Sequence, residues 1–176
     1  VDEELLKQAL RAYIVAAAMS SIRSGKFGPS TASGMTFKSL NEVKNKVAPV
    51  TSMLIHPSAE LDDHFNVKNI INRWWDGERG TAGEGVINDL EIRIWIDEYD
   101  DYRTSATKIA REYTGRFDPV DAPTWDEVEE VIRREIIPST RIDVINSRPE
   151  SDERPQFEAR VDSLGVWHPP VNQSSI

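Results

Sequence analysis

Apolar residues recur at helical spacing near the start of the chain. They occupy positions 5, 6, 9, 10, 13, 14, 17 and 18, and acidic residues fill positions 2–4. Apolar residues three or four apart share one face of a helix, and acidic charge in the first turn favours the helix dipole. The pattern therefore predicts a helix over residues 5–23. The Gly-, Ser- and Thr-rich residues 24–38 predict a loop.

A short, continuous apolar run follows at Ser52–Ile55, between two prolines of which the second is Pro57. A run of this length without polar alternation predicts a fully buried strand, which Pro57 ends. Ser58 then offers a hydroxyl to cap a helix over residues 59–75. His56 and Ser58 thus stand at the carboxyl end of the strand, the edge at which open α/β sheets bind ligands. A histidine that only hydrogen-bonds within a turn is the alternative interpretation of His56.

Two tryptophans lie on the apolar face of the predicted helix over 59–75. We interpret Trp74 and Trp75 as core residues rather than a base-stacking pair, because few basic residues are near them. A glycine-rich connector follows at 76–85. Residues 86–101 fit two patterns: alternation at positions 90, 92, 94 and 96 predicts a strand, whereas positions 87, 90, 94 and 95 share a helix face.

The second half of the chain begins with an amphipathic pattern at 104–113, which predicts another helix. The sequence T-W-D-E from Thr124 to Glu127 is a capping box. In this motif the Thr124 side chain accepts from the Glu127 amide, and the Glu127 side chain reaches back. A helix is therefore expected to begin here and to stop at Pro138.

A second buried strand is predicted over Arg141–Ser147, and it ends in the small polar residues Asn146 and Ser147. The two buried strands, Ser52–His56 and Ile142–Ile145, are expected to be neighbours in a small parallel sheet. Their polar ends would then lie at one edge.

The last part of the chain contains weaker signals. Residues 148–155 are charged and proline-bearing and predict a loop, residues 157–161 a short strand or helix, and residues 164–167 another short strand. The tail from His168 is rich in Pro, Asn and Ser, and it is expected to fray.

Composition places the chain among ordinary globular proteins. Its 176 residues are 39% hydrophobic and 29% charged, which suggests one domain or a piece of a larger one. We divide it into an N-terminal helix (1–23), a loop with a short helix (24–48) and an α/β part (49–176). No apolar run approaches the roughly 18 residues of a membrane span. The absence of cysteine excludes disulfides and thiolate metal sites, and it is compatible with a reducing cytoplasm.

Net charge limits the possible partners. The value of −9 argues against a sequence-independent nucleic-acid clamp, although a local basic face is compatible with it. The Gly25-Lys26 pair is not a phosphate loop, because Ser20 stands where the Walker pattern needs glycine and Phe27 where it needs Ser or Thr. The chain therefore offers no phosphate-binding loop of its own.

Two acidic clusters remain. Asp97-Glu98-Tyr99-Asp100 mimics the magnesium-binding motif of helicase-type ATPases, but without a phosphate loop upstream we interpret it as a solvated helix end. A second cluster, consisting of His56, Asp62, Asp63 and His64, has the side chains of a metal site. Its carboxylates point along different helix faces, so the structural interpretation is favoured and no metal is assigned.

Four segments, taken in order, resemble a known family. They are L-L-K-Q-A-L-R-A-Y-I-V-A-A-A from Leu5, S-M-L-I-H-P-S from Ser52, T-W-D-E-V from Thr124 and R-I-D-V-I-N-S from Arg141. The chain resembles the Z-one domain family, whose members are segments of superfamily-two helicase-like ATPases found with prokaryotic restriction and DNA-repair systems. Pro57 departs from the aliphatic residue expected at its position.

The resemblance implies a helix-rich α/β segment around a small parallel sheet, part of a RecA-like second lobe, with a helix over 86–101. It implies ATP-binding and acidic motifs upstream, and downstream a strand followed by an S-R-G-L-T-L-E-G-L motif. The chain would then be a fragment that is not catalytic alone, with ATP and Mg expected only for the full-length parent.

The same resemblance suggests a role in DNA restriction, repair or antiviral defence in the cytoplasm. His56, Ser58, Asn146 and Ser147 would form a polar rim that contacts a DNA backbone through uncharged donors. The remaining helicase lobes would be its partners, and no membrane is expected. Oligomeric state is left open.

An assembly protein without enzymatic activity is the alternative function. Phage head–tail connectors and tail terminators are acidic, lack catalytic motifs, and combine an N-terminal helix with strands and a late hairpin. Residues 141–166 would supply that hairpin, with residues 148–155 as its loop.

Overall fold

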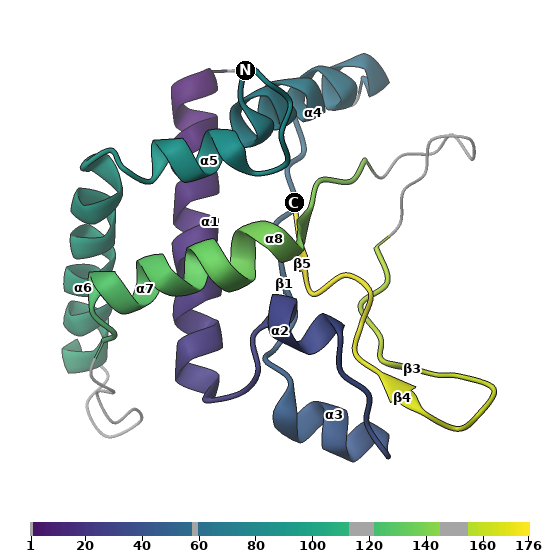
Figure 1. Cartoon of the computed structure of the whole chain (residues 1–176). Coiled ribbons are helices and arrows are strands. Elements are labelled where there is room, and N and C mark those ends of the chain that lie inside the picture. The colour runs from purple at the N-terminus through teal and green to yellow at the C-terminus, as the bar shows by residue number, and fades with distance from the viewer. Residues whose placement is uncertain (1, 58–59, 113–121, 145–154) are drawn as a thin grey trace.

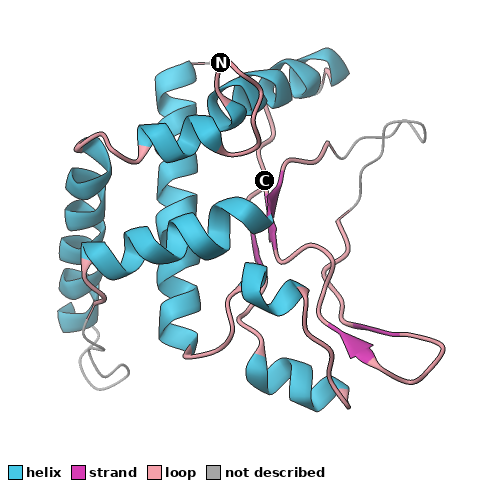
Figure 2. Cartoon of the chain, viewed as in Figure 1, coloured by secondary structure: helices cyan, strands magenta, loops and turns pink. Residues whose placement is uncertain are grey.

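The computed structural model of the protein describes residues 2–57, 60–112, 122–144 and 155–176. Over these residues the fold is mixed α/β. Helices pack around the long helix α1 (Glu3–Ser24), and a small parallel sheet lies beside it (Figures 1 and 2). A two-stranded hairpin projects away from the helices at the lower right of Figure 1.

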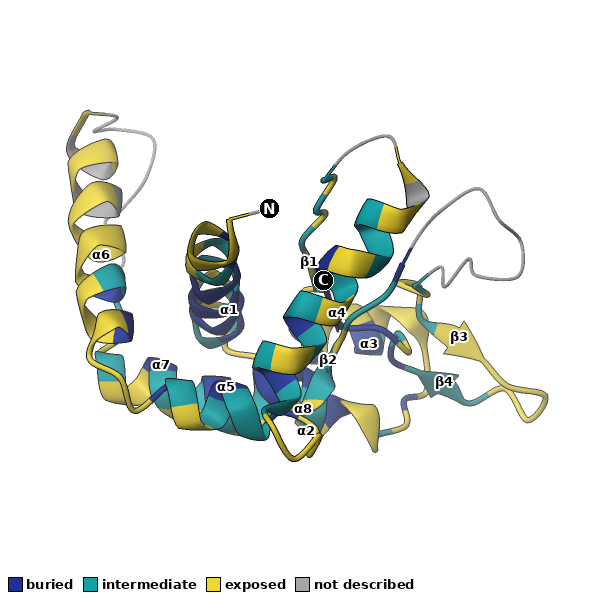
Figure 3. Cartoon of the chain, turned by 90° about the horizontal axis from the view of Figure 1, so that it is seen from above, coloured by how far each residue is buried: buried dark blue, intermediate teal, exposed yellow. Residues whose placement is uncertain are grey.

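Helix α1 is the centre of the fold. Asp2 caps its first turn by accepting two backbone hydrogen bonds, and Gly25 ends it in the left-handed conformation, with a φ of 62°. Its buried face includes Leu10, Ile14 and Ala18, which pack against α6 (Ile94–Glu112), α7 (Trp125–Val131) and the π-helix η1 (Ile132–Ile136). The predicted helix over 5–23 is confirmed. Figure 3 shows α1 end-on, with its buried residues turned toward the other helices.

The stretch 86–101 consists of parts of two helices joined by a turn at residues 90–93. Helix α4 (Leu61–Asp76) is followed by α5 (Glu84–Asp89) and then by α6, so the strand interpretation of this stretch is wrong. Trp95 shows why the helical spacing holds: it is completely buried and stacks on Trp74, with ring centroids 6.5 Å apart. Trp75 is 4% exposed and belongs to the same core, as predicted.

The capping box at α7 is confirmed. The Thr124 side chain accepts from the Glu127 backbone amide at 3.4 Å, and the Thr124 amide donates to the Glu127 carboxylate at 2.8 Å. These hydrogen bonds hold the pKa of Glu127 below its usual value. The helix passes through η1 into α8 (Ile137–Ser139), where Pro138 lies in the last turn and the helix ends, as expected.

The predicted loop over 24–38 contains a short helix, α2 (Pro29–Ser33), and α3 (Leu40–Lys46) follows it. Five residues are too few to show helical periodicity, so tertiary contacts stabilise α2. The Glu135 carboxylate of η1 accepts from the Thr31 backbone amide at 2.9 Å and also from the Thr31 hydroxyl. The π-helix thereby places a carboxylate at the exposed amides of α2.

The sheet has three parallel strands of two residues each. Strand β1 (Thr51–Ser52) and strand β2 (Thr140–Arg141) both pair with β5 (Ser174–Ser175), so the order is β1–β5–β2. The predicted small parallel sheet is present. The expectation that the two buried strands are direct neighbours is wrong, because β5 lies between them.

The first strand is also shorter and less buried than predicted. It ends at Ser52, Leu54 is 82% exposed, and Met53 and Ile55 are half-buried. The backbone leaves the sheet after Met53, whose amide donates to the carbonyl of Ser175 at 2.9 Å. The apolar run therefore does not form a long strand here. Its side chains line a cavity instead of being buried against both faces of a sheet.

The C-terminal tail, expected to fray, is the most polar part of the core. Asn172, Gln173, Ser174 and Ser175 are between 0% and 4% exposed. Backbone bonds on both sides fix Ser174 and Ser175 in the sheet, and the Ser174 hydroxyl bonds with Tyr13. Each of the two amide side chains makes one hydrogen bond, whereas Asn172 Nδ2 and Gln173 Oε1 are buried without a partner among the described residues. The cost of burying these polar groups is therefore compensated in part by hydrogen bonds.

The hairpin consists of β3 (Arg160–Val161) and β4 (Trp167–His168), in antiparallel register. The two short strands predicted at 157–161 and 164–167 are thus present in part. The hairpin proposed with residues 148–155 as its loop is misplaced, since the turn lies at 162–166; residues 148–154 are outside the described part. Phe37 bridges to Trp167 and joins the hairpin to the segment before α3.

Among the helices in the described part of the chain, none has both the length and the apolar character needed to cross a membrane.

Candidate functional site

A cavity of about 360 Å³ lies at the carboxyl edge of the three-stranded sheet. Its walls are formed by the residues that follow β1, by residues 142–144 after β2, by the end of β5 and by one face of α4. Most of this lining is apolar, with Met53, Ile55, Ile71 and Phe157 among its members. The cavity thus occupies the edge at which parallel sheets carry their ligand sites.

One wall of the cavity is basic. His56, from the segment after β1, contacts His64 of α4 edge to face, with ring centroids 5.4 Å apart. Lys68 lies one helical turn beyond His64 and lines the same cavity. Two imidazoles and an ammonium group provide hydrogen-bond donors toward an anionic oxygen.

The opposite wall carries one acidic side chain. Asp143 follows β2, its side chain is 5% exposed, and its carboxylate lies 3.3 Å from the guanidinium of Arg141. The hydroxyl of Ser175 approaches the same carboxylate at 3.5 Å. Asp143 is thus engaged by two groups, and the cavity has His56, His64 and Lys68 on one side and this carboxylate on the other.

Of the four residues of the predicted polar rim, the structure describes His56 alone. It is exposed and lines the cavity. Ser58, Asn146 and Ser147 lie outside the described residues. The predicted cap of the following helix is displaced, because α4 begins at Leu61 and Glu60 occupies its N-cap position.

Sequence reasoning missed Lys68 and gave His64 a different role. The sequence places His64 only in a candidate metal cluster with His56, Asp62 and Asp63. Within the described ranges, no group of three or more His, Asp or Glu side chains is arranged to hold a metal ion. The spacing of four residues between His64 and Lys68 was the available signal, since it places both on one helix face.

The acidic sequence 97–100 lies in the first two turns of α6, and Asp97 and Asp100 are exposed, so the interpretation as a solvated helix end is correct for these two residues. Glu98 turns inward and accepts a hydrogen bond from the Arg11 guanidinium at 2.9 Å. Burial raises the pKa of Glu98, and the Arg11 hydrogen bond opposes that shift. Tyr99 is buried and donates to the carbonyl of Pro123. Two of the four residues therefore serve the core.

Comparison of the chain with protein-family models, with curated proteins and with solved structures finds no significant match.

Proposed function

We propose that this chain is a segment of the second RecA-like lobe of a helicase-like, ATP-dependent enzyme that acts on DNA. In this role the chain is not catalytic by itself. It contributes contacts to the DNA backbone, while the remaining lobes of the parent protein bind ATP and Mg²⁺. Restriction, repair or antiviral defence in the cytoplasm is the corresponding cellular setting.

The basic wall of the cavity is the observation that carries this proposal. His56, His64 and Lys68 converge at the carboxyl edge of a parallel sheet, and a DNA phosphate accepts hydrogen bonds from such groups. One or two phosphate contacts are compatible with a chain of net charge −9, because they need only a local donor set.

The position of β5 gives further support. The resemblance to the Z-one domain family implies a strand at about this place in the chain, ahead of a motif of the second lobe. Ser174–Ser175 occupies the middle of the parallel sheet, between β1 and β2. The segments that carry the resemblance begin in these two strands, at Ser52 and at Arg141. A central parallel strand with helices beside it is compatible with a RecA-like lobe.

The test is DNA binding by the chain and DNA-stimulated ATP hydrolysis by the parent protein. Lys68→Ala should weaken DNA binding by a similar factor for different DNA sequences. It should also make the affinity less dependent on salt concentration, by the amount that corresponds to about one phosphate contact. His56→Ala should reduce both DNA affinity and DNA-stimulated hydrolysis. Lys44→Ala, on the exposed side of α3, is the matched control. Unchanged DNA affinity and hydrolysis in both cavity variants would reject the proposal.

An assembly protein is the second candidate, and the hairpin β3–β4 is the observation that favours it. Val161 is 51% exposed and Leu164 is 86% exposed, so the hairpin presents apolar side chains to a neighbour. Sedimentation would distinguish the two functions. A stable ring that Leu164→Ser dissociates supports assembly, and a monomer that binds DNA supports the first proposal.

A further inference from the structure

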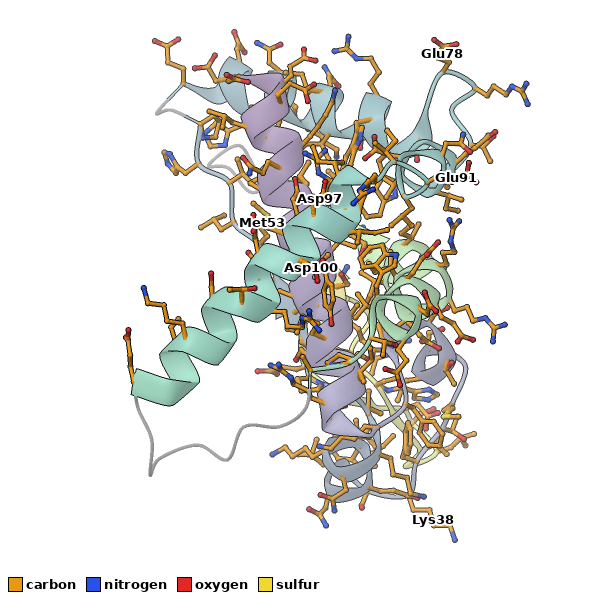
Figure 4. All side chains as sticks on the ribbon, turned by 90° about the vertical axis from the view of Figure 1, so that its left-hand side faces the viewer. Lys38, Met53, Glu78, Glu91, Asp97 and Asp100 are labelled. Carbon is orange, nitrogen blue, oxygen red and sulfur yellow. The ribbon has the colours of Figure 1, made fainter. Side chains whose placement is uncertain are left out.

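A groove of about 300 Å³ separates α1 from α6, on the side of the molecule away from the sheet. Leu5, Ala9 and Ala12 of α1 form one wall, and Glu98, Asp101 and Tyr102 of α6 form the other. Figure 4 shows α6 crossing in front of α1, with Asp97 and Asp100 along its length. The groove is therefore bounded by two helices and open to solvent.

The α1 wall combines three apolar residues with one polar residue, Gln8, which is exposed. Leu5 is 63% exposed, and the neighbouring positions one and two turns further along hold the small side chains of Ala9 and Ala12. Small side chains let another backbone approach closely, and a row with helical spacing matches the length of a helix rather than a single side chain. Tyr102 is 43% exposed and adds an aromatic edge to the same groove.

The α6 wall carries more acidic groups than the ion pairs of the described residues neutralise. The Arg11 guanidinium lies 2.9 Å from the carboxylate of Glu98 and 3.9 Å from that of Asp89, so one cation faces two anions. The second oxygen of Glu98, Oε2, is buried without a hydrogen-bond partner among the described residues. Asp101 adds another carboxylate at the rim.

Other carboxylates of α6 differ in this respect. Asp97 lies 3.6 Å from the guanidinium of Arg93, and Asp100 lies 3.5 Å from that of Arg103. Each thus has an arginine close to it, Arg93 just before the helix and Arg103 within it. The excess negative charge is concentrated where the groove is, and a buried carboxylate oxygen without a donor favours a ligand that brings one.

We propose that the groove between α1 and α6 docks a basic, amphipathic helix of a partner protein. The apolar face of that helix lies on Leu5, Ala9 and Ala12, and its arginine or lysine side chains reach Glu98 and Asp101. A second copy of this chain fits less well, because two chains of net charge −9 repel each other. The proposal does not rest on the DNA-binding function, since it uses a different face.

The probe is a synthetic peptide of about four helical turns, with leucine and alanine on one face and arginine on the other, labelled with fluorescein. Its binding to the whole chain is followed by fluorescence anisotropy. A peptide of identical composition in scrambled order is the control for simple charge attraction. The amphipathic peptide should bind saturably and more tightly than the scrambled one.

Three variants locate the binding site. Ala12→Phe fills the groove and should weaken peptide binding by about tenfold or more, as loss of a central contact does. Asp101→Asn should weaken it by about threefold, and less at high salt. Asp126→Asn, an exposed carboxylate on α7, should leave it unchanged. Circular dichroism verifies the fold of each variant, and Tyr102→Ala replaces Ala12→Phe if the latter fails to fold.

Three results would overturn the proposal. The first is equal binding of the amphipathic and scrambled peptides. The second is peptide binding that is the same in the groove variants as in the unmodified chain. The third is a dimer in sedimentation that Ala12→Phe dissociates, which would assign the groove to a second copy of the chain.

Discussion

The helical body around α1 and the three-stranded sheet beside it are both buried, but different groups stabilise them. In the helical body, large apolar side chains such as Ile14, Trp95 and Ile132 are completely buried. In the sheet, the buried side chains are hydroxyls and amides. Tyr13 joins the two regions, because its ring is on α1 while its hydroxyl hydrogen-bonds with Ser174 at 3.0 Å.

The comparison shows how two kinds of burial differ in cost. Apolar burial contributes roughly in proportion to area, so a single large side chain in the helical body contributes several kcal/mol. A satisfied hydrogen bond contributes about 1 kcal/mol net, although leaving its partner unsatisfied costs more. The sheet is therefore expected to be specified by its hydrogen bonds while the helical body supplies most of the stability.

The largest effect is expected at Trp95. Trp95→Ala should lower the free energy of unfolding by about 3–5 kcal/mol, because it removes a fully buried ring and its stacking on Trp74. The substitution also leaves the Asp89 carboxylate without the indole donor, which lies at 3.0 Å. Urea unfolding measures the change. Ile109→Ala, at a 56% exposed position of the same helix, should change stability by about 0.5 kcal/mol or less. Similar losses for both would contradict this account of the core.

The second largest loss of stability is expected when the buried ion pair between Arg11 and Glu98 is broken. Arg11→Met should destabilise the protein by about 3 kcal/mol at pH 7, because Glu98 would remain buried without its cation. Lys7→Met, which breaks an exposed pair with Glu4, should have little effect. The double variant Arg11→Met with Glu98→Gln should recover part of the loss. Absence of recovery would indicate that Arg11 acts through packing alone.

The pH dependence follows from the same pair. Because the pKa of Glu98 is raised in the folded protein, that state keeps a proton which the unfolded chain has released. The contribution of Glu98 to stability therefore falls as pH rises from about 4.3, its value in an unfolded chain, toward the raised pKa. Arg11→Met removes the hydrogen bond that opposes the rise in the pKa of Glu98. The loss of stability with rising pH should therefore be larger in this variant. Unfolding curves between pH 4 and pH 7 measure it.

A smaller effect is expected in the sheet. Tyr13→Phe removes the hydroxyl that bonds with Ser174 and accepts from the Ser175 amide at 3.2 Å, and it should cost about 1–2 kcal/mol. Amide exchange at Thr51 and Ser175 should accelerate more than exchange in α1, because only the sheet loses a bond. Tyr102→Phe, at an exposed tyrosine, is the control. Equal acceleration in α1 and the sheet would show that the two regions unfold together.

The smallest effect is expected in the hairpin. Asp162 binds the His168 ring at 3.0 Å and two backbone amides of the turn, and these bonds lower its pKa. Its stabilisation of the turn should be complete above about pH 4, the unfolded value, and should be lost as pH falls through the lowered pKa. Amide chemical shifts of residues 162–168 in an acid titration report this change. In Asp162→Asn the same shifts should not depend on pH in this range.

Local patterns predicted most of the helices and a small parallel sheet, but not the central strand β5 of that sheet. The period of α1 and the capping box of α7 are properties of contiguous residues, so they can be read without knowing the fold. Residues 86–101 satisfied two periods, and the burial of Trp95 in the assembled core decided between them. Helix α2 has no period to detect, since Glu135 stabilises it from a distant part of the chain.

The sequence predicted where the candidate site lies, but not most of the residues that form it. The sequence suggests a ligand site at His56 because it follows an apolar run, and in the structure His56 lines a cavity, although β1 already ends at Ser52. Lys68 was not found, since its role depends on the packing of α4 against the segment after β1. The tail was missed for a related reason: serine pairs in a strand carry no apolar signal, and only their partners in β1 and β2 show why they are buried.

The central position of β5 has a consequence for the order of folding. Strands β1 and β2 bond to β5 and not to each other, and the three strands are far apart in the sequence. Contacts between distant residues form slowly, because a long loop must be closed before any bond is gained, whereas helices form from near neighbours. The helices are therefore expected to assemble early, and the sheet to close last, when β5 enters between two strands already held by the helical body.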